Sequence, residues 1–303
     1  MQTSTLIAHI ESTARPRLAA SWDKSGVQIA SPVAEIKTMA VALDPSSETV
    51  RQAVDQGADF LLCHHPLALT PKLPDRVDDF HHVLTMCLEK KMWLYSAHTS
   101  LDANPAGPVN WLGKALGLTR TRVLEVTFRE TPTLVRLRTQ NEPGWTERTC
   151  WPEELDQLRA TETDAIIHEL ALSAPSREYG FGCIGALPRA MSWPEFSTLL
   201  MPRLGSVPRL VGRAPEVVEK VAYCPGSGAD LAPRAFAQGA QVFLTGDLKF
   251  HQAQAVQDLG LTMDVGHFCL EETMMRAWSQ ELAEQLAPAG TRVIFLPGHD
   301  PFA

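Results

Sequence analysis

The chain has 303 residues, of which 45% are hydrophobic and 20% are charged, and its formal net charge at pH 7 is -8. This length and composition are typical of a folded globular protein with one large or two modest domains, and they exclude a largely disordered chain. The negative charge argues against general nucleic-acid binding, which needs excess lysine and arginine, but it is compatible with a local basic pocket.

Cysteine usage and the absence of long apolar segments indicate the compartment. The six cysteines are scattered, with no Cys-x-x-Cys pair and no spacing typical of a disulfide framework. No segment approaches the roughly 20 apolar residues of a membrane span, and the first residues lack the basic and apolar pattern of a signal peptide. We therefore expect a cytoplasmic protein with reduced thiols and no membrane association.

The first third of the chain alternates between strands and helices. Residues 36–44 predict a strand, and a helix follows over 45–56. The apolar run at 58–65 predicts a second strand, helical spacing of apolar residues predicts a helix over 78–91, and residues 92–98 form a third extended run. This β-α-β-α-β order predicts parallel strands.

The middle of the chain differs from both ends. Residues 122–215 contain alternating segments such as 131–140 and frequent turn signals, which predict a smaller α+β domain inserted into the first. The β-α order then returns, with strands predicted at 217–226, 240–247 and 261–267 and helices at 229–239 and 249–259. We expect an α/β domain, 1–121 with 216–303, whose parallel or mixed sheet and flanking helices come from both chain ends.

Metal-ligand residue types occur where predicted strands end. The carboxyl ends of parallel strands meet at one edge of a sheet, where the functional crevice of open α/β sheets lies. Imidazole and carboxylate groups are ligands of zinc, manganese and iron. The candidates are the adjacent pair His64 and His65, the pair His98 and Asp102, and the pair His267 and Glu271.

The adjacent histidines can share one site only if the chain leaves strand geometry at that point. Neighbouring residues on a strand point to opposite faces, so His64 and His65 must lie beyond the strand end, where Pro66 favours a departure from strand geometry. The alternative is a surface turn. The second adjacent pair, His81 and His82, lies on a predicted amphipathic helix, and there we expect a solvated or partly packed pair.

The other two pairs have structural alternatives as well. Asp102 follows His98 by four residues in a loop-like, proline-containing segment, where it could simply form an Asx turn. Glu271 could be an acidic residue at a helix start, unless the preceding strand turns directly into a helix and puts it on one face with His267. The loop 224–230 resembles a phosphate-binding loop, but it lacks the Walker residues, and we expect a structural turn.

Seven ordered motifs over about two-thirds of the chain resemble one known family, the dinuclear metal-centre hexameric proteins called GTP cyclohydrolase 1 type 2, or NGG-interacting-factor-three-like proteins. The motifs are SWDKSGVQIA (21–30), LDPSSETVRQAVDQGADFLLCHHPL (43–67), YSAHTSLDA (95–103), CPGSGADL (224–231), LTGDLKFHQA (244–253), DVGHFCLE (264–271) and DPF (300–302).

The resemblance implies a two-metal site and a toroidal homo-hexamer. The implied ligands are His64, His65, Asp102, His267 and Glu271, with Asp102 or Glu271 bridging the ions. The resemblance also makes His98 an additional ligand or a neighbour of the ligands, and Asp247 and His251 residues that orient ligands.

The chemistry of such a site favours hydrolysis. Two divalent ions (zinc, manganese or iron) activate water and polarise a substrate, which suits a metal-dependent hydrolase of a small molecule, a nucleotide among them. His98 is the candidate proton shuttle. Two alternatives stay open: a non-catalytic metal-handling or scaffold assembly, and, less favoured, a dinuclear phosphoesterase.

Overall fold

A computed structural model describes residues 1–138, 144–163, 165–171 and 176–302. The chain divides into two compact units, one formed by Met1–Glu125 with Gly180–Ala303 and the other by Val126–Tyr179. The smaller inserted α+β domain expected over 122–215 stays a prediction. In the structure, the segment from 180 to 215 belongs to the first unit.

The first sheet of the larger unit has five strands in the order β1-β4-β3-β2-β14. Strands β2, β3, β4 and β14 are parallel, and β1 runs antiparallel to β4. Because β14 comes from the C-terminal segment, both ends of the chain contribute to this sheet. The strand bounds are Gly26–Ile29 (β1), Thr38–Ala42 (β2), Phe60–Cys63 (β3), Trp93–Ser96 (β4) and Arg292–Phe295 (β14).

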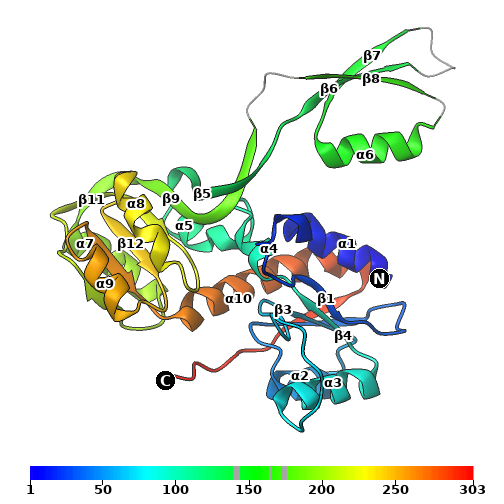
Figure 1. The fold of residues 1–303 in the computed structure, drawn as a ribbon, viewed down its shortest axis with the longest axis horizontal. Helices are drawn as coiled ribbons and strands as arrows, with labels where there is room; N and C mark the ends of the chain where they lie inside the picture. The colour runs from blue at the N-terminus through cyan, green and yellow to red at the C-terminus, as the bar shows by residue number, and fades with distance from the viewer. Residues whose placement is uncertain (139–143, 164, 172–175, 303) are drawn as a thin grey trace. The chain divides into compact units, whose positions relative to one another are not determined.

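Helices cover both faces of the first sheet (Figure 1). Alternate strand residues point to opposite faces, so Met39 and Val41 pack with α1 and α10, whereas Ala40 and Ala42 pack with α2 and α3. Ser46 caps α2 by accepting a hydrogen bond from the Thr49 amide. The helix bounds are Thr3–Thr13 (α1), Ser47–Asp55 (α2), Asp79–Lys90 (α3) and His267–Leu286 (α10).

The second sheet of the larger unit has six strands in the order β10-β13-β12-β11-β9-β5. Strands β11, β12 and β13 are parallel, and β9 and β10 run antiparallel to their neighbours β11 and β13. The bounds are Thr119–Glu130 (β5), Arg177–Ser192 (β9), Arg209–Val211 (β10), Val217–Tyr223 (β11), Val242–Thr245 (β12) and Leu261–Asp264 (β13).

Helices also pack on both faces of the second sheet. Leu112 of α5 and Phe196 of α7 pack on one face, and Ala235 of α8 and Val256 of α9 pack on the other. The bounds are Trp111–Ala115 (α5), Trp193–Leu200 (α7), Ala232–Ala237 (α8) and Phe250–Val256 (α9), and a one-turn helix, α4, spans Thr99–Asp102. The predicted α/β class is confirmed, but most of the C-terminal β-α elements build this second sheet instead of extending the first.

The smaller unit contains a three-stranded antiparallel sheet in the order β7-β6-β8 and one helix, α6. Val135 and Cys150 from the sheet pack with Leu155 and Leu158 from the helix. The bounds are Thr133–Arg138 (β6), Thr146–Cys150 (β7), Pro152–Thr161 (α6) and Ile166–Ala171 (β8). The alternating segment predicted at 131–140 corresponds to β6, and its last two residues lie outside the described residues.

The length and polarity of the described helices determine whether any of them could span a membrane. The longest of them, α10, is amphipathic, with a buried face that includes Met274 and Trp278 and charged residues between. Among the described residues no helix is both long enough and apolar enough to span a bilayer.

Candidate metal centre

The six predicted site residues come together in the larger unit. They follow the ends of β3 and β4 in the first sheet and of β13 in the second. We call the group the His–carboxylate cluster, and its members are His64, His65, His98, Asp102, His267 and Glu271.

His64 and His65 lie beyond the end of their strand, as a shared site requires. Strand β3 ends at Cys63, and the next two backbone amides both donate to the Leu43 carbonyl, at 3.1 and 3.0 Å. Successive amides of a strand point in opposite directions, so this pattern shows that the chain has left strand geometry. The two imidazole rings therefore lie on the same side, with centroids 5.2 Å apart.

Two short turns deliver the other pairs. Gly266, with φ of 81°, lets the chain pass from β13 directly into α10, so that His267 and Glu271 are one helical turn apart on the same face. The segment after His98 was expected to be loop-like, but α4 forms one helical turn there and places Asp102 on the side of His98. A single turn of four residues gives too little periodicity to be predicted from the sequence.

Glu271 is at the centre of the cluster. Its Oε2 atom lies 2.9 Å from His267 Nε2 and 3.1 Å from His65 Nε2, and its Oε1 atom lies 3.6 Å from His64 Nε2. His64 Nε2 also lies 3.7 Å from Asp102 Oδ2, and the Nε2 atoms of His65 and His267 are 3.4 Å apart. The His98 ring lies 5.2 Å from that of His64.

Each histidine of the cluster is held at Nδ1 by an oxygen atom. The acceptors are the Ala97 carbonyl for His64 at 2.8 Å, Asp44 for His65 at 2.6 Å, Asp23 for His98 at 2.8 Å and Asp247 for His267 at 2.7 Å. Because carbonyl and carboxylate oxygens accept, Nδ1 carries the proton in all four rings. In the neutral form of each ring, Nε2 is then the nitrogen available as a metal ligand.

Two of these acceptors, Asp23 and Asp44, were missed as functional residues by the sequence reasoning. Asp44 directly follows β2, which neighbours β3, so its place at the same sheet edge was a usable signal. Asp23 lies three residues before β1, whose first residue pairs with the last residue of β4. No strand was predicted there from the sequence, so only the position of Asp23 in the SWDKSG motif could have suggested a role. Asp247, expected to orient a ligand, does contact His267.

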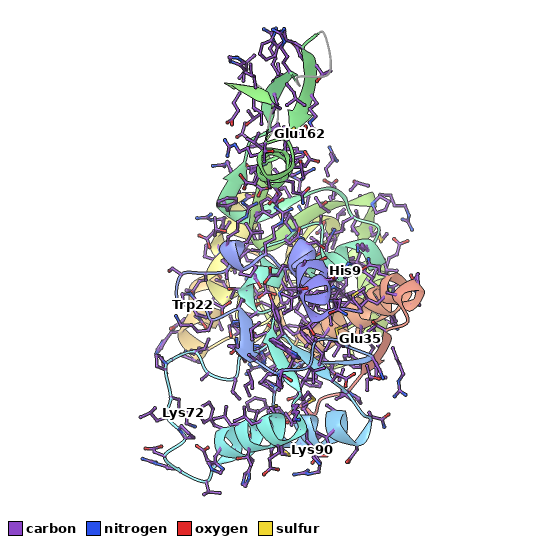
Figure 2. The ribbon with its side chains drawn as sticks, turned by 90° about the vertical axis from the view of Figure 1, so that its right-hand side faces the viewer. His9, Trp22, Glu35, Lys72, Lys90 and Glu162 are labelled. Atoms are coloured by element: carbon purple, nitrogen blue, oxygen red, sulfur yellow. The ribbon has the colours of Figure 1, made fainter. Side chains whose placement is uncertain are left out.

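Asp23 is the most strongly held of the three carboxylates. It is buried, and it accepts hydrogen bonds from the His98 ring, the Ser25 hydroxyl and the Thr99 amide and hydroxyl. Burial raises its pKa, but the hydrogen bonds from His98, Thr99 and Ser25 outweigh burial and hold the pKa well below its usual range. The neighbouring Trp22 contacts the His98 ring edge-on, yet 56% of its surface is exposed (Figure 2).

The glycine-rich loop at 224–230 supports Glu271. Gly226 has φ of +63°, and a Cβ atom there would lie 2.2 Å from Glu271 Oε1. The Gly226 carbonyl accepts a hydrogen bond from the Gly246 amide at 2.8 Å, which fixes the loop to the end of β12. The expected structural turn is therefore also the wall against which the central carboxylate rests.

The charges of the cluster depend strongly on one another. Burial raises the pKa of Glu271, but His64, His267 and His65 outweigh burial and hold it well below its usual range. The Glu271 carboxylate raises the pKa of His267 to about 9. Burial lowers the pKa of His65, but Asp44 and Glu271 raise it to about 10. Burial and the Glu271 charge raise the pKa of Asp102, against the effect of His64.

The donor set fits a divalent metal ion. Two buried atoms of the cluster, His64 Nε2 and Asp102 Oδ1, have no hydrogen-bond partner among the described residues. Such atoms are costly unless something else binds them. Two ligand atoms on a tetrahedral zinc ion lie about 3.3 Å apart. The distances of 2.9 to 3.7 Å between Glu271, Asp102 and the histidines span this value.

Other histidines lie outside the cluster. His81 and His82 are on α3, as expected, and belong to neither of the metal-ligand groups found among the described residues. His251 is an exposed residue of α9 whose ring contacts Phe250. In the described structure it forms no hydrogen bond or ion pair with the cluster, so the orienting role expected for it has no support in these contacts.

Comparison with known proteins agrees with the motifs. The model of the Duf34/NIF3 (NGG1p interacting factor 3) family matches residues 1–301. A protein of Clostridium perfringens named GTP cyclohydrolase 1 type 2 homolog is 24% identical over 100% of this chain and 99% of its own, and a Bacillus subtilis protein of the same name is 25% identical over 87% of each.

Solved structures show the same fold. The crystal structure of a Bacillus cereus protein related to NIF3 has a TM-score of 0.84 and 23% sequence identity, and covers 100% of this chain and 99% of its own. Reduced HcgD from Methanocaldococcus jannaschii has a TM-score of 0.72 and 23% identity over 98% of each chain. Together with the family match over almost the whole sequence, these likenesses show that the chain belongs to the Duf34/NIF3 family.

Proposed function

We propose that the His–carboxylate cluster binds two divalent metal ions and that the protein uses them for hydrolysis. The proposed ligands are His64, His65, Asp102, His267 and Glu271, and the candidate ions are zinc, manganese and iron, which all accept imidazole and carboxylate ligands. The observation that carries this proposal is the orientation of Glu271, whose two oxygens face different histidines.

A carboxylate in this position is suited to bridge two ions. Glu271 Oε1 faces His64, whereas Oε2 faces His65 and His267. Asp102 lies on the His64 side and adds a second carboxylate there. One tetrahedral ion takes four ligands, and the five proposed ligands exceed that number, so the number of donors also favours two ions over one.

The residues around the ions have distinct roles in the proposed reaction. Bound divalent ions would polarise a substrate oxygen and lower the pKa of water toward about 7. His98 accepts the proton released by the attacking water and returns it to the leaving group, because imidazole exchanges protons near neutral pH. Asp23 holds the other ring nitrogen of His98 and stabilises the positive charge that the ring acquires.

We infer that the substrate class is a nucleotide. Relatives carry the name GTP cyclohydrolase 1 type 2 homolog. Hydrolytic ring opening adds the water hydroxyl to a ring carbon and a proton to the departing nitrogen, which needs the groups described above. The side chains of His65 and His267 are 24% and 34% exposed, and this access favours a site open to substrate over a closed storage site.

Elemental analysis of protein purified without chelator tests the metal site. We expect two ions per chain in the wild type, loss of both in Glu271→Gln, and loss of at least one in Asp102→Ala. The control His82→Ala replaces an exposed histidine outside the cluster and should keep both ions. Unchanged metal content in both cluster variants would refute the site.

Turnover by the metal-loaded protein tests the reaction. We expect hydrolysis of at least one member of a panel of nucleotides, and a loss of turnover of about 10²-fold or more in His98→Ala with its metal content retained. Two bound ions without turnover on nucleotide and phosphoester panels would instead favour the metal-handling alternative. Turnover on phosphoesters alone would favour the phosphoesterase alternative.

We also propose a homo-hexamer, on the basis of the family resemblance. The mass of the wild-type protein in solution, measured by light scattering at several concentrations, should correspond to six chains. A mass of one or two chains at all concentrations would contradict this assembly.

A further inference from the structure

A basic pocket lies on the second sheet of the larger unit and shares no residue with the His–carboxylate cluster. It has a volume of about 330 Å³. Three of its lining residues are cationic and, among those described, none is acidic. The lining residues are Arg120 and Arg122 from β5, Ile184, Gly185 and Ala186 from β9, and Lys220 from β11.

The sheet brings the three cations to one place. Strands β11, β9 and β5 are neighbours, and β5 is at the edge of the sheet (Figure 1). Lys220 pairs directly with Ala186, so its side chain lies across β9 from the edge strand. Arg120 and Arg122 are two residues apart on that strand and both line the pocket. The cations therefore surround the small side chain of Ala186.

No described acidic residue neutralises the positive charge of the pocket. Within the part of the chain that the structure describes, Arg120, Arg122 and Lys220 form no ion pair, although Lys220 Nζ donates to the Gln238 carbonyl at 3.4 Å. Glu125, the next acidic residue along β5, faces Arg234 at 3.5 Å instead. Three uncompensated cations around one cavity are unexpected in a chain with a net charge of -8.

The backbone at Arg120 adds an independent observation. Its φ of 51° lies in the left-handed region, which favours glycine and strains a residue with a long side chain. A use of the Arg120 guanidinium group in ligand binding would offset this backbone cost. The group makes no ion pair within the described structure, so that use is consistent with a bound ligand.

We propose that the basic pocket binds a small anion that carries a diphosphate group. Guanidinium groups bind phosphate oxygens in bidentate fashion, and Lys220 adds a third charge from the opposite side. The volume lies at the lower end of the range for small-molecule pockets, and therefore suits a diphosphate or a nucleoside diphosphate better than a polymer. This site is separate from the metal cluster and does not depend on its proposed function.

Calorimetric titration of the metal-loaded protein with inorganic pyrophosphate tests the proposal. We expect saturable binding that weakens as ionic strength rises. Arg122→Glu should weaken binding by about tenfold or more, since it removes a charged hydrogen-bond donor and adds repulsion. Arg213→Glu makes the same change in net charge at an exposed arginine outside the pocket and should leave the affinity within about twofold.

Two more variants test whether Arg120 contributes to binding and whether the pyrophosphate binds the pocket or the metal ions. Arg120→Gly removes a cation and relieves the backbone strain, so it should weaken binding without lowering the melting temperature. Asp102→Ala should leave pyrophosphate binding intact, because its effect is confined to the cluster. Loss of binding in Asp102→Ala would assign the pyrophosphate to the metal ions and overturn the proposal.

Four other results would also overturn the proposal. The first is the absence of binding to the wild type, and the second is equal weakening by Arg122→Glu and Arg213→Glu. The third is a change in oligomeric mass in Arg122→Glu, which would make the pocket part of a subunit interface. Tighter binding of single-stranded DNA than of pyrophosphate, through the same arginines, would assign the pocket to a nucleic acid instead.

Discussion

Replacing Gly226 with alanine tests whether the loop at 224–230 positions the central carboxylate. The new Cβ atom would lie 2.2 Å from Glu271 Oε1, whereas ordinary contacts begin at 3.4 Å. The carboxylate must therefore move by roughly 1 Å, and a ligand displaced that far costs about 10²-fold in activity. The φ of +63° adds a backbone cost of about 1–2 kcal/mol.

Gly290→Ala is the matched control for this variant. Gly290 has a similar φ of +72°, but no atom lies within 4 Å of the position that its Cβ would take. Both variants should lose about 1–2 kcal/mol of free energy of unfolding, measured by chemical denaturation. Only Gly226→Ala should lose bound metal, measured by elemental analysis after dialysis. Equal metal content in the two variants would refute the role given to Gly226.

Other predictions concern the carboxylates that hold the histidines. Asp44→Asn should weaken metal binding about 10- to 100-fold, whereas Asp75→Asn, in an exposed loop, should not. Asp23→Asn should keep the metal but lower turnover. Folding lowers the pKa of Asp23, so the ionised carboxylate stabilises the fold above about pH 4. The difference in melting temperature between Asp23→Asn and the wild type should therefore shrink below about pH 4. In metal-free protein, folding raises the pKa values of His65 and His267 to about 10 and 9, so the protonated rings stabilise the folded state. This contribution is complete below about pH 6.5 and should be lost as pH rises toward 9–10. Metal binding at pH 7 should release about two protons in calorimetry across buffers; release of none would contradict the protonated state of these rings.

Regular elements were predictable from the sequence because local patterns specify them. The apolar run at 58–65 and the helical spacing at 78–91 correspond to β3 and α3, and the parallel order of β2, β3 and β4 follows from the helices between them. The division of the strands into two sheets was not predictable. This division depends on which strand edges pair with one another. For example, β14 pairs with β2, more than 240 residues away in the sequence.

The candidate site was predictable only in part. Strand exits identified His64, His65 and His267, because a sheet brings its strand ends to one edge. The turn that places Asp102 beside His98 contains only four residues, too few for a recognisable period. Asp23 reaches His98 through a contact across 75 residues that include several strands and helices of the first sheet, and no local pattern encodes such a contact.

Helix α10 explains why no single segment reveals the cluster. Leu270 packs in the core of the second sheet, whereas Met274, about one turn later, packs in the core of the first sheet. Glu271 lies between these two residues along the helix and is buried. Its position relative to His64 and His65 is therefore set by the packing of α10 on two separate cores. A carboxylate fixed in this way can contact histidines from both sheets only after both have folded, so the full donor set is a property of the folded unit and not of any motif.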